Sequence, residues 1–366
     1  METKAQLFDI KIFTAILILL GIGIAFMYGA SAPLADKLFS DRSYFFNRQL
    51  IYGIMSVIIL VVVSRINPNV FFKLANILLI ITVISLVLVL IPGIGSERKG
   101  GRRWINLGFF HFQPSELAKI TLLIFLSKHL ALHEEEIPKK LNKLIFPGFF
   151  AVLLIFTLVL LEKDFSSSIL ILVVALNLIF IAGVQLKYFA YLAITGIPVI
   201  YFIITSYEHM KLRLNIYLMK FFLPNYIPHQ EKQAMKAINE AGFFGNGLGI
   251  GSFHSKIPES HTDFYFASII ADIGLLGGIF VILVFCYVFI RNFMLVKNIN
   301  DKRFVFLIYG VTLLFVWQTL LNLGSVLGLL PIAGLPLPFL SYGGNSLFIS
   351  SFGMGLILGI SRFRSS

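Results

Sequence analysis

Ten long apolar segments constrain this sequence more than any other feature. Each is close to the roughly 20 residues that an α-helix needs to cross the hydrocarbon core of a bilayer. Hydrophobic residues make up 58% of the chain and charged residues only 13%, a composition typical of polytopic membrane proteins. We therefore predict an all-α polytopic membrane protein with about ten transmembrane helices, built as one integral-membrane domain over residues 1–366. The predicted spans are residues 12–30, 49–64, 71–91, 114–131, 144–161, 166–183, 187–205, 264–290, 304–325 and 344–361.

The distribution of lysine and arginine predicts the orientation in the membrane, because loops on the cytoplasmic side carry an excess of both. With both termini cytoplasmic, the inner loops hold 15 of these residues and the outer ones 14. The long loop at 206–263, between the seventh and eighth spans, contributes weakly to the rule. Without it the tally is 15 against 8, so we expect cytoplasmic termini and one large extracytoplasmic loop.

The net charge of +12 does not indicate nucleic-acid binding here. In a membrane protein, basic residues set the topology and contact anionic lipid head groups. We therefore expect membrane lipids as partners and no nucleic acid. The one cysteine, Cys286, lies inside an apolar span, so neither a disulfide framework nor a cysteine-based metal site is indicated.

A short polar run, residues 257–264, ends where the eighth span begins. In extended chain Glu259, His261 and Asp263 would share one face. Thr262 and Asp263 are both helix-capping types, so we expect a helix to start there. This places a carboxylate at the membrane edge beside the positive end of a helix. Two interpretations stay open: a functional carboxylate, since charge at such a place is costly, or a helix cap in a wet loop.

A cluster of cations lies on the predicted outer side, at residues 96–104. It combines four basic residues with two glycines and Trp104. Arg102 and Arg103 offer forked donors, and glycine lets backbone N–H groups approach a ligand, so a phosphate or pyrophosphate group fits. The alternative is simple contact with lipid head groups, with Trp104 as an interface anchor.

Three further polar features lie at membrane edges. Glu116 and Lys119 are three residues apart on one helix, and the pair either lines a polar cavity or is a structural ion pair. Asp164 is placed to cap the following helix. The stretch 335–346 combines paired prolines with two glycines and several hydroxyl groups, so it is either the floor of a cavity or a well-packed re-entrant turn.

Three of these stretches closely resemble the SEDS family of bacteria (shape, elongation, division and sporulation). They are residues 113–119, 258–264 and 336–344, and both residues 244–249 and Arg213 also fit the family pattern. The resemblance covers essentially the whole chain in the same order. The chain departs from the family at residues 162–167, where the family usually has Gln-Pro-Asp-Leu/Phe-Gly-Ser/Thr: the aspartate is kept, but the proline and glycine are not. The lack of long terminal tails makes it more similar to RodA, the elongation member, than to FtsW.

The resemblance implies a ten-helix peptidoglycan glycosyltransferase in the bacterial cytoplasmic membrane. Such an enzyme polymerises lipid II, an undecaprenyl-pyrophosphate-linked disaccharide-peptide, at the outer face, together with a class B penicillin-binding protein as transpeptidase. The essential aspartate of the family falls on Asp263, which is the candidate general base. The candidate substrate-binding residues are Arg102, Arg103, Trp104, Glu116, Lys119, Asp164, Arg213, His261, Thr262, Ser341, Tyr342 and Gly343.

No cofactor is firmly indicated. Glu259, His261 and Asp263 could hold a divalent cation such as Mg²⁺ or Mn²⁺ against the pyrophosphate, but three such groups in a loop are a weak metal signal.

A lipid II flippase and a non-catalytic scaffold for the transpeptidase are the alternative functions. A flippase needs polar groups through the whole membrane depth. Here the polar motifs gather on the outer side and only Glu116, Lys119 and Asp272 lie deeper, which favours an enzyme.

Overall fold

The prediction of an all-α membrane protein is confirmed, and each predicted span overlaps helical residues in the described part of the chain. The computed structural model describes residues 8–98, 100–108, 111–136, 145–223, 226–249, 254 and 256–364. The helices are α1 (Ile10–Ala25), α2 (Met27–Phe39), α3 (Tyr44–Arg65), α4 (Pro68–Leu90), α5 (Pro114–Leu132), the π-turn η1 (Ile145–Phe149), α7 (Phe150–Leu161), α8 (Phe165–Ile181), α9 (Leu186–Ser206), α10 (Glu208–Phe222), α11 (His229–Ala241), α12 (Tyr265–Val296), α13 (Lys302–Val326) and α14 (Gly344–Ser361).

Six helices in the described part of the chain are long and apolar enough to cross a membrane, with α1 and α2 counted as one. Two shorter apolar helices, Phe146–Leu161 and Phe165–Ile181, accompany them. Helix α5 has bilayer length but carries Glu116, Lys119 and Lys128. Its buried charges mark it as a helix of the protein interior, because charge facing lipid is costly.

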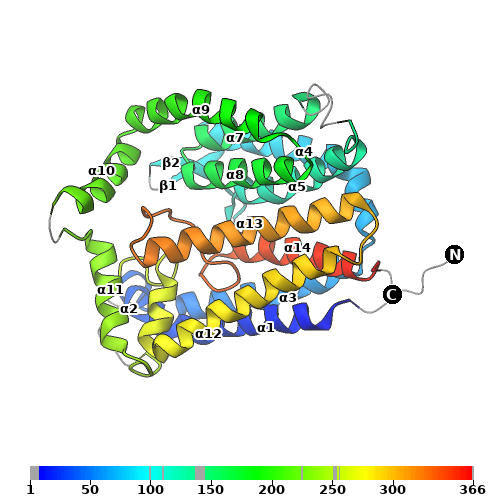
Figure 1. Cartoon of the computed structure of the whole chain (residues 1–366). Helices are drawn as coiled ribbons and strands as arrows, with labels where there is room; N and C mark the ends of the chain where they lie inside the picture. The colour runs from blue at the N-terminus through cyan, green and yellow to red at the C-terminus, as the bar shows by residue number, and fades with distance from the viewer. Residues whose placement is uncertain are drawn as a thin grey trace.

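The helices form two groups joined by α13. Helices α4, α5, α7, α8 and α9 lie on one side and α1, α2, α3, α12 and α14 on the other, with α13 between them (Figure 1). Helix α13 packs against α5 and α8 of the first group and against α12 and α14 of the second. The site described below is built where loops from both groups meet at one end of this arrangement.

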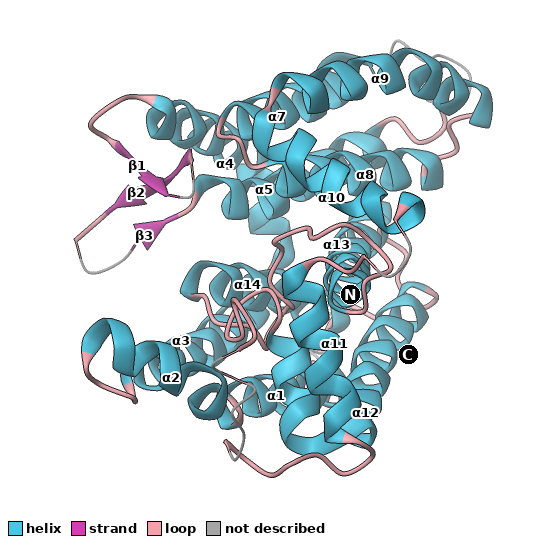
Figure 2. Ribbon diagram, turned by 90° about the vertical axis from the view of Figure 1, so that its left-hand side faces the viewer, coloured by secondary structure: helices cyan, strands magenta, loops and turns pink. Residues whose placement is uncertain are grey.

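The two ends of the bundle differ in character. At one end the start of α1 meets the end of α14, where the Asp9 amide donates to Ser361 Oγ at 2.9 Å and Arg291 pairs with the Asp9 carboxylate at 2.9 Å. We call this the terminal end. The opposite end carries α10, α11 and a small sheet (Figure 2), and we call it the loop end.

The small sheet was not predicted from the sequence. Strands β1 (Gly95–Arg98), β2 (Gly101–Asn106) and β3 (His111–Phe112) pair antiparallel in that order. Gly100 takes φ +78° in the β1–β2 turn, a conformation that glycine adopts without steric cost. A Cβ on Gly101 would stand 2.6 Å from the Glu162 carbonyl oxygen, so this glycine lets the sheet approach the α7–α8 turn.

Helix α12 is broken at Gly274, which has φ +74°. The break leaves backbone groups without helical partners inside an apolar region, where each must find another partner. A glycine-rich segment supplies them: the amides of Asn246 and Gly247 donate to the carbonyls of Ala271 and Asp272, both at 3.0 Å. The segment 244–249 thus closes the break in α12. Beside it the buried Asp272 side chain contacts His254, with Oδ1 2.8 Å from Nε2.

Candidate active site

Asp263 lies in a tight turn directly before α12. Glu259 has φ +55° and its carbonyl accepts hydrogen bonds from the amides of Thr262 and Phe264, at 3.1 and 3.2 Å. The predicted cap was early by one to two residues, because the N-cap of α12 is Phe264, which makes no side-chain capping bond. The capping interpretation of Asp263 is therefore wrong, and its half-buried carboxylate lies outside the helix.

The turn also contradicts the expected shared face of Glu259, His261 and Asp263, because the segment is not extended. Glu259 Oε2 accepts a hydrogen bond from Thr262 Oγ1 at 2.8 Å. His261 is buried, with its ring centroid 4.7 Å from that of Phe45. No group of three histidine, cysteine or acidic side chains within the described residues could hold a metal ion. The residues that suggested Mg²⁺ or Mn²⁺ therefore do not fit a metal site.

A second segment, 335–343, is locked against this turn. Ser341 Oγ donates to the Thr262 carbonyl at 2.7 Å, and the Tyr342 amide donates to the His261 carbonyl at 2.8 Å. Ser341 Oγ also accepts from the Leu337 amide at 2.9 Å. These bonds join two motifs about 80 residues apart in the sequence into one surface, which no local sequence pattern reveals.

The walls of this surface are aromatic. The rings of His261 and Tyr342 lie 5.7 Å apart, and Phe45 of α3 contacts both. Burial raises the pKa of Tyr342 well above its ordinary value, with a smaller contribution from Tyr52. The phenol therefore keeps its proton and remains a hydrogen-bond donor. Gly343, next to it, has φ +153° and opens the turn into α14.

Asp263 and Arg213 converge on Gly334. A Cβ at Gly334 would stand 3.6 Å from Asp263 Oδ2 and 3.9 Å from Arg213 Nη1. Arg213 belongs to α10, which is held over the α13–α14 connection: Arg213 Nη1 donates to the Ile332 carbonyl at 3.4 Å and Tyr217 Oη to the Leu329 carbonyl at 2.9 Å. The structure thus brings together a carboxylate and a guanidinium from segments 50 residues apart, as a base and an anion-binding group require.

Asp164 occupies a second polar cluster, where it acts as a structural connector. It is the N-cap of α8, as predicted, with Oδ1 accepting from the Ser167 amide at 3.4 Å. Its other oxygen accepts from Gln113 Nε2 and Ser115 Oγ, both at 3.2 Å. Only 5% of the residue is exposed. These partners hold the α7–α8 turn to the start of α5.

Arg102 and Arg103 are split between the two faces of β2, because neighbouring residues of a strand point in opposite directions. Arg103 reaches the α7–α8 turn, donating to the Glu162 carbonyl at 3.4 Å and lying 3.9 Å from Asp164 Oδ1. Arg102 is more exposed and lies 3.9 Å from Glu97 Oε2. Trp104, two residues along, is half-buried, and its carbonyl accepts from Ser96 Oγ at 3.0 Å.

The predicted Glu116–Lys119 pair is present and buried. Lys119 Nζ donates to Glu116 Oε1 at 2.7 Å, and the two side chains are 1% and 7% exposed for Lys119 and Glu116. The small cavity beside Lys119 is otherwise lined by leucine, isoleucine and valine side chains from α5, α8 and α13. Of the two interpretations, this apolar surrounding favours the structural ion pair over a polar cavity.

Glu162 is a buried carboxyl group that the sequence did not single out. It is 0% exposed, and neither carboxyl oxygen has a hydrogen-bond partner within the described residues. Burial and the neighbouring Asp164 carboxylate raise the pKa of Glu162 to about 9, against the opposing effect of Arg103. The group is therefore protonated at neutral pH. Its one signal in the sequence is its place where the family usually has a glutamine.

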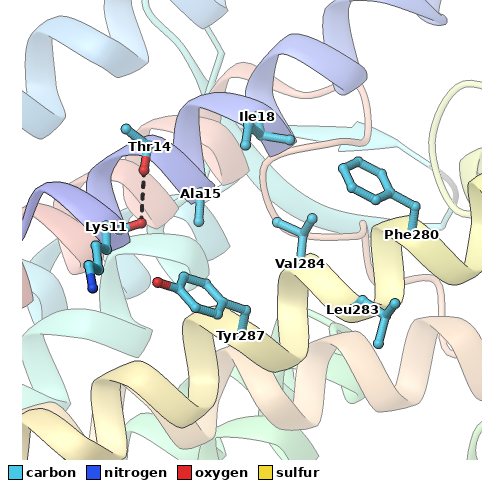
Figure 3. Close-up of a pocket in the computed structure, with 8 residues that line it drawn as sticks. All are labelled: Lys11, Thr14, Ala15, Ile18, Phe280, Leu283, Val284 and Tyr287. Atoms are coloured by element: carbon cyan, nitrogen blue, oxygen red, sulfur yellow. Dashed lines mark hydrogen bonds between the residues drawn. The ribbon is translucent and has the colours of Figure 1, made fainter.

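A separate apolar groove of about 490 Å³ lies between α1 and α12 (Figure 3). It is lined by the first half of α1 and the second half of α12, toward the terminal end, with Lys11 at its edge. The groove therefore does not belong to the site around Asp263, which precedes the first turn of α12.

The fold and the site define a polytopic helical membrane protein whose polar segments interlock at one end of the bundle. The chain belongs to the FtsW/RodA/SpoVE family of cell cycle proteins, whose model matches residues 10–366. This confirms the family expected from the motifs.

Alignments with two relatives cover nearly the whole chain. Stage V sporulation protein E of Bacillus subtilis (strain 168) is 31% identical over 99% of both chains. A probable peptidoglycan glycosyltransferase FtsW of Trichlorobacter lovleyi is 34% identical over 97% of this chain and 93% of the relative.

Solved structures share the fold. A chain from a study of the structural coordination of polymerization and crosslinking by a peptidoglycan synthase complex superposes with a TM-score of 0.77, at 24% identity and 98% coverage of both chains. RodA of Thermus thermophilus superposes with a TM-score of 0.70, at 23% identity and 98% coverage of both.

Proposed function

We propose that this chain is a peptidoglycan glycosyltransferase that polymerises lipid II, with Asp263 as general base. The observation that carries the proposal is the convergence of the Asp263 carboxylate and the Arg213 guanidinium on Gly334. Relatives at 34% and 33% identity are named as probable peptidoglycan glycosyltransferases, which supports the same activity here.

The reaction follows from these two groups. The acceptor sugar hydroxyl loses its proton to Asp263 as its oxygen attacks the anomeric carbon of the donor. The bond from that carbon to the lipid pyrophosphate breaks, and negative charge develops on the leaving oxygen. We assign the stabilisation of that charge to Arg213, beside Gly334, and to Arg102 of the sheet. Lys119, a candidate substrate-binding residue, is paired with Glu116 and is not assigned this role.

The proposed setting is the bacterial cytoplasmic membrane, with both termini cytoplasmic and the loop end outside. The excess of basic residues, 15 against 8, supports it, and so does the shared position of the start of α1 and the end of α14. A class B penicillin-binding protein is the proposed partner, because the related chain of TM-score 0.77 comes from a complex that couples polymerization and crosslinking.

The test is polymerisation of purified lipid II by the purified chain, alone and with its cognate transpeptidase. Asp263→Asn keeps the size and hydrogen-bonding shape of the side chain but cannot accept the proton. We expect glycan product per folded molecule to fall by about 10²-fold or more, with normal insertion and transpeptidase binding. Near-normal polymer from Asp263→Asn would remove this residue from the chemistry. A wild-type chain that makes no polymer, even with its partner, would favour the flippase or scaffold functions.

A further inference from the structure

A stripe of three buried polar residues lies on one face of α13, inside a predicted membrane span. Gln318, Asn322 and Ser325 follow each other at four- and three-residue spacing, which places them on one side of a helix. All three are at most 4% exposed. The proposed reaction uses none of them. Polar side chains buried at membrane depth are costly, so they are usually kept for a structural or functional role.

Two members of the stripe contact the α13–α14 connection, and Ser325 Oγ also donates to the Leu321 carbonyl within α13 at 2.7 Å. Gln318 Nε2 donates to the Pro336 carbonyl at 2.8 Å. Ser325 Oγ donates to the Pro331 carbonyl at 3.0 Å and accepts from the Ala333 amide at 3.1 Å. These bonds satisfy backbone groups of an irregular segment packed among helices, as membrane burial requires.

Asn322 differs because it joins two segments that are distant in the sequence. Its Nδ2 donates to the Asp263 carbonyl at 2.8 Å and to the Leu335 carbonyl at 2.7 Å. A primary amide has two N–H donors, and both are used. Since both neighbours are carbonyl oxygens, the atom that faces them must be the nitrogen.

We propose that Asn322 is a positioning residue for the general base. It fixes the main chain of Asp263 against Leu335, and Leu335 follows Gly334, the point on which the Asp263 carboxylate and Arg213 converge. The double hydrogen bond therefore sets the distance between the base and the cation that faces the leaving group. This inference rests on the proposed role of Asp263.

The chain offers matched variants. Asn322→Leu and Asn322→Asp keep the number and branching of the side-chain heavy atoms and remove both donors. The leucine is bulkier, and the aspartate adds a charge facing two carbonyls. Asn322→Ser keeps one donor. Gln318→Met is the control, because it breaks a bond to the same connection one helical turn away without touching Asp263.

The experiment measures lipid II polymerisation by the full chain with its cognate transpeptidase, per mole of folded protein, together with thermal unfolding in detergent. We expect Asn322→Leu and Asn322→Asp to lower kcat by about 10-fold or more, because small displacements of a catalytic group are costly. KM should stay within about 2-fold, since the bonds do not touch substrate. Asn322→Ser should lie between these variants and the wild type. Gln318→Met should lower the midpoint of unfolding similarly but leave kcat within about 2-fold.

A normal kcat in folded Asn322→Leu, or in Asn322→Ser should Asn322→Leu not fold, would overturn the inference. So would an equal loss of kcat in Gln318→Met, which would make the whole stripe structural. The double variant Asp263→Asn with Asn322→Leu should be no slower than Asp263→Asn, because groups that act as a unit are not additive. A further loss in the double variant contradicts positioning through Asp263. Near-normal activity in Asp263→Asn overturns the general-base role itself, and this inference with it.

Discussion

Asp263 and Glu162 are carboxyl groups at the loop end with opposite surroundings. Asp263 is half-buried, and its carboxylate and the Arg213 guanidinium both lie near Gly334. These surroundings suit the proposed role of Asp263, which is to contact substrate and take up a proton. Glu162 is fully buried with no hydrogen-bond partner for either carboxyl oxygen within the described residues, so the neutral acid is the form that the fold accepts. A neutral carboxylic acid has nearly the shape of the glutamine that the family usually places there.

Glu162→Gln should therefore stabilise the protein in a pH-dependent way. The folded pKa of about 9 lies above the ordinary value of 4.5, so the folded state holds a proton that the unfolded state has lost. The resulting loss of stability is absent below pH 4.5, grows as the pH rises to about 9 and is constant above it. Thermal unfolding in detergent should show the glutamine variant to be more stable at pH 8 and equal to wild type near pH 4.5. The exposed control Glu135→Gln should behave as wild type, and parallel pH profiles for wild type and Glu162→Gln would contradict the assignment.

The two arginines of β2 should differ when changed one at a time. Arg103→Gln removes the link between the sheet and the α7–α8 turn, so it should lower the yield and the unfolding midpoint of the protein. Within the described residues, the ion pair of Arg102 is a solvent-accessible contact with Glu97. Arg102→Gln should therefore leave folding unchanged and reduce the use of lipid II by about 10-fold, as expected for one charge-assisted contact. Each variant is the control for the other. If the two variants lost stability and activity equally, the opposite orientations of Arg102 and Arg103 on β2 would not give them different roles.

At the scale of elements, the sequence predicted the apolar helices, because crossing a membrane requires an apolar run of a fixed length. Helix α14 coincides with the predicted span 344–361, because its apolar run has bilayer length. The first span was predicted to end at residue 30, yet α2 continues to Phe39 through Pro33 and polar residues. Strands of four, six and two residues carry too short a pattern to be recognised.

In the candidate site, too, local features were predictable from the sequence and long-range contacts were not. The capping role of Asp164 is local and is confirmed by its bond to the Ser167 amide. The hydrogen bonds between Ser341 and Thr262 and between Asn322 and Asp263 connect distant parts of the chain. A local sequence pattern cannot predict such contacts. The substrate contacts assigned to the remaining site residues stay predictions.

Within α5, the Glu116–Lys119 pair should behave as a unit. Lys119→Met leaves the Glu116 carboxylate buried without its partner, which should cost about 3–5 kcal/mol of stability. Thermal unfolding and the yield of folded protein measure this loss. The double variant Lys119→Met with Glu116→Gln removes both charges and should recover most of it. A fully stable Lys119→Met variant would show that the pair does not hold the helix.

For the whole molecule, α13 joins two helix groups whose polar segments meet at the loop end, and every residue of the proposed reaction lies there. The comparisons do not single out one cellular role. Relatives at 31% and 34% identity are named stage V sporulation protein E and probable peptidoglycan glycosyltransferase FtsW, and the rod shape determining protein RodA shares the fold at 23%. The elongation role expected from the sequence therefore stays a prediction.

The orientation of the whole chain decides whether the reaction can take place outside the cell. In a Cys286→Ala background, which removes the one native thiol, a cysteine is placed at Lys236 on α11 or at Glu135 after α5. The Lys236 side chain is 59% exposed at the loop end. Glu135 is exposed beside Glu134, which bridges to Lys302 at the start of α13. An impermeant thiol reagent added to intact cells should label Lys236→Cys and not Glu135→Cys, while permeabilised cells should label both. The reverse pattern would place Asp263 on the cytoplasmic side, where the acceptor strand outside the cell cannot reach it, and would remove the proposed function together with the orientation.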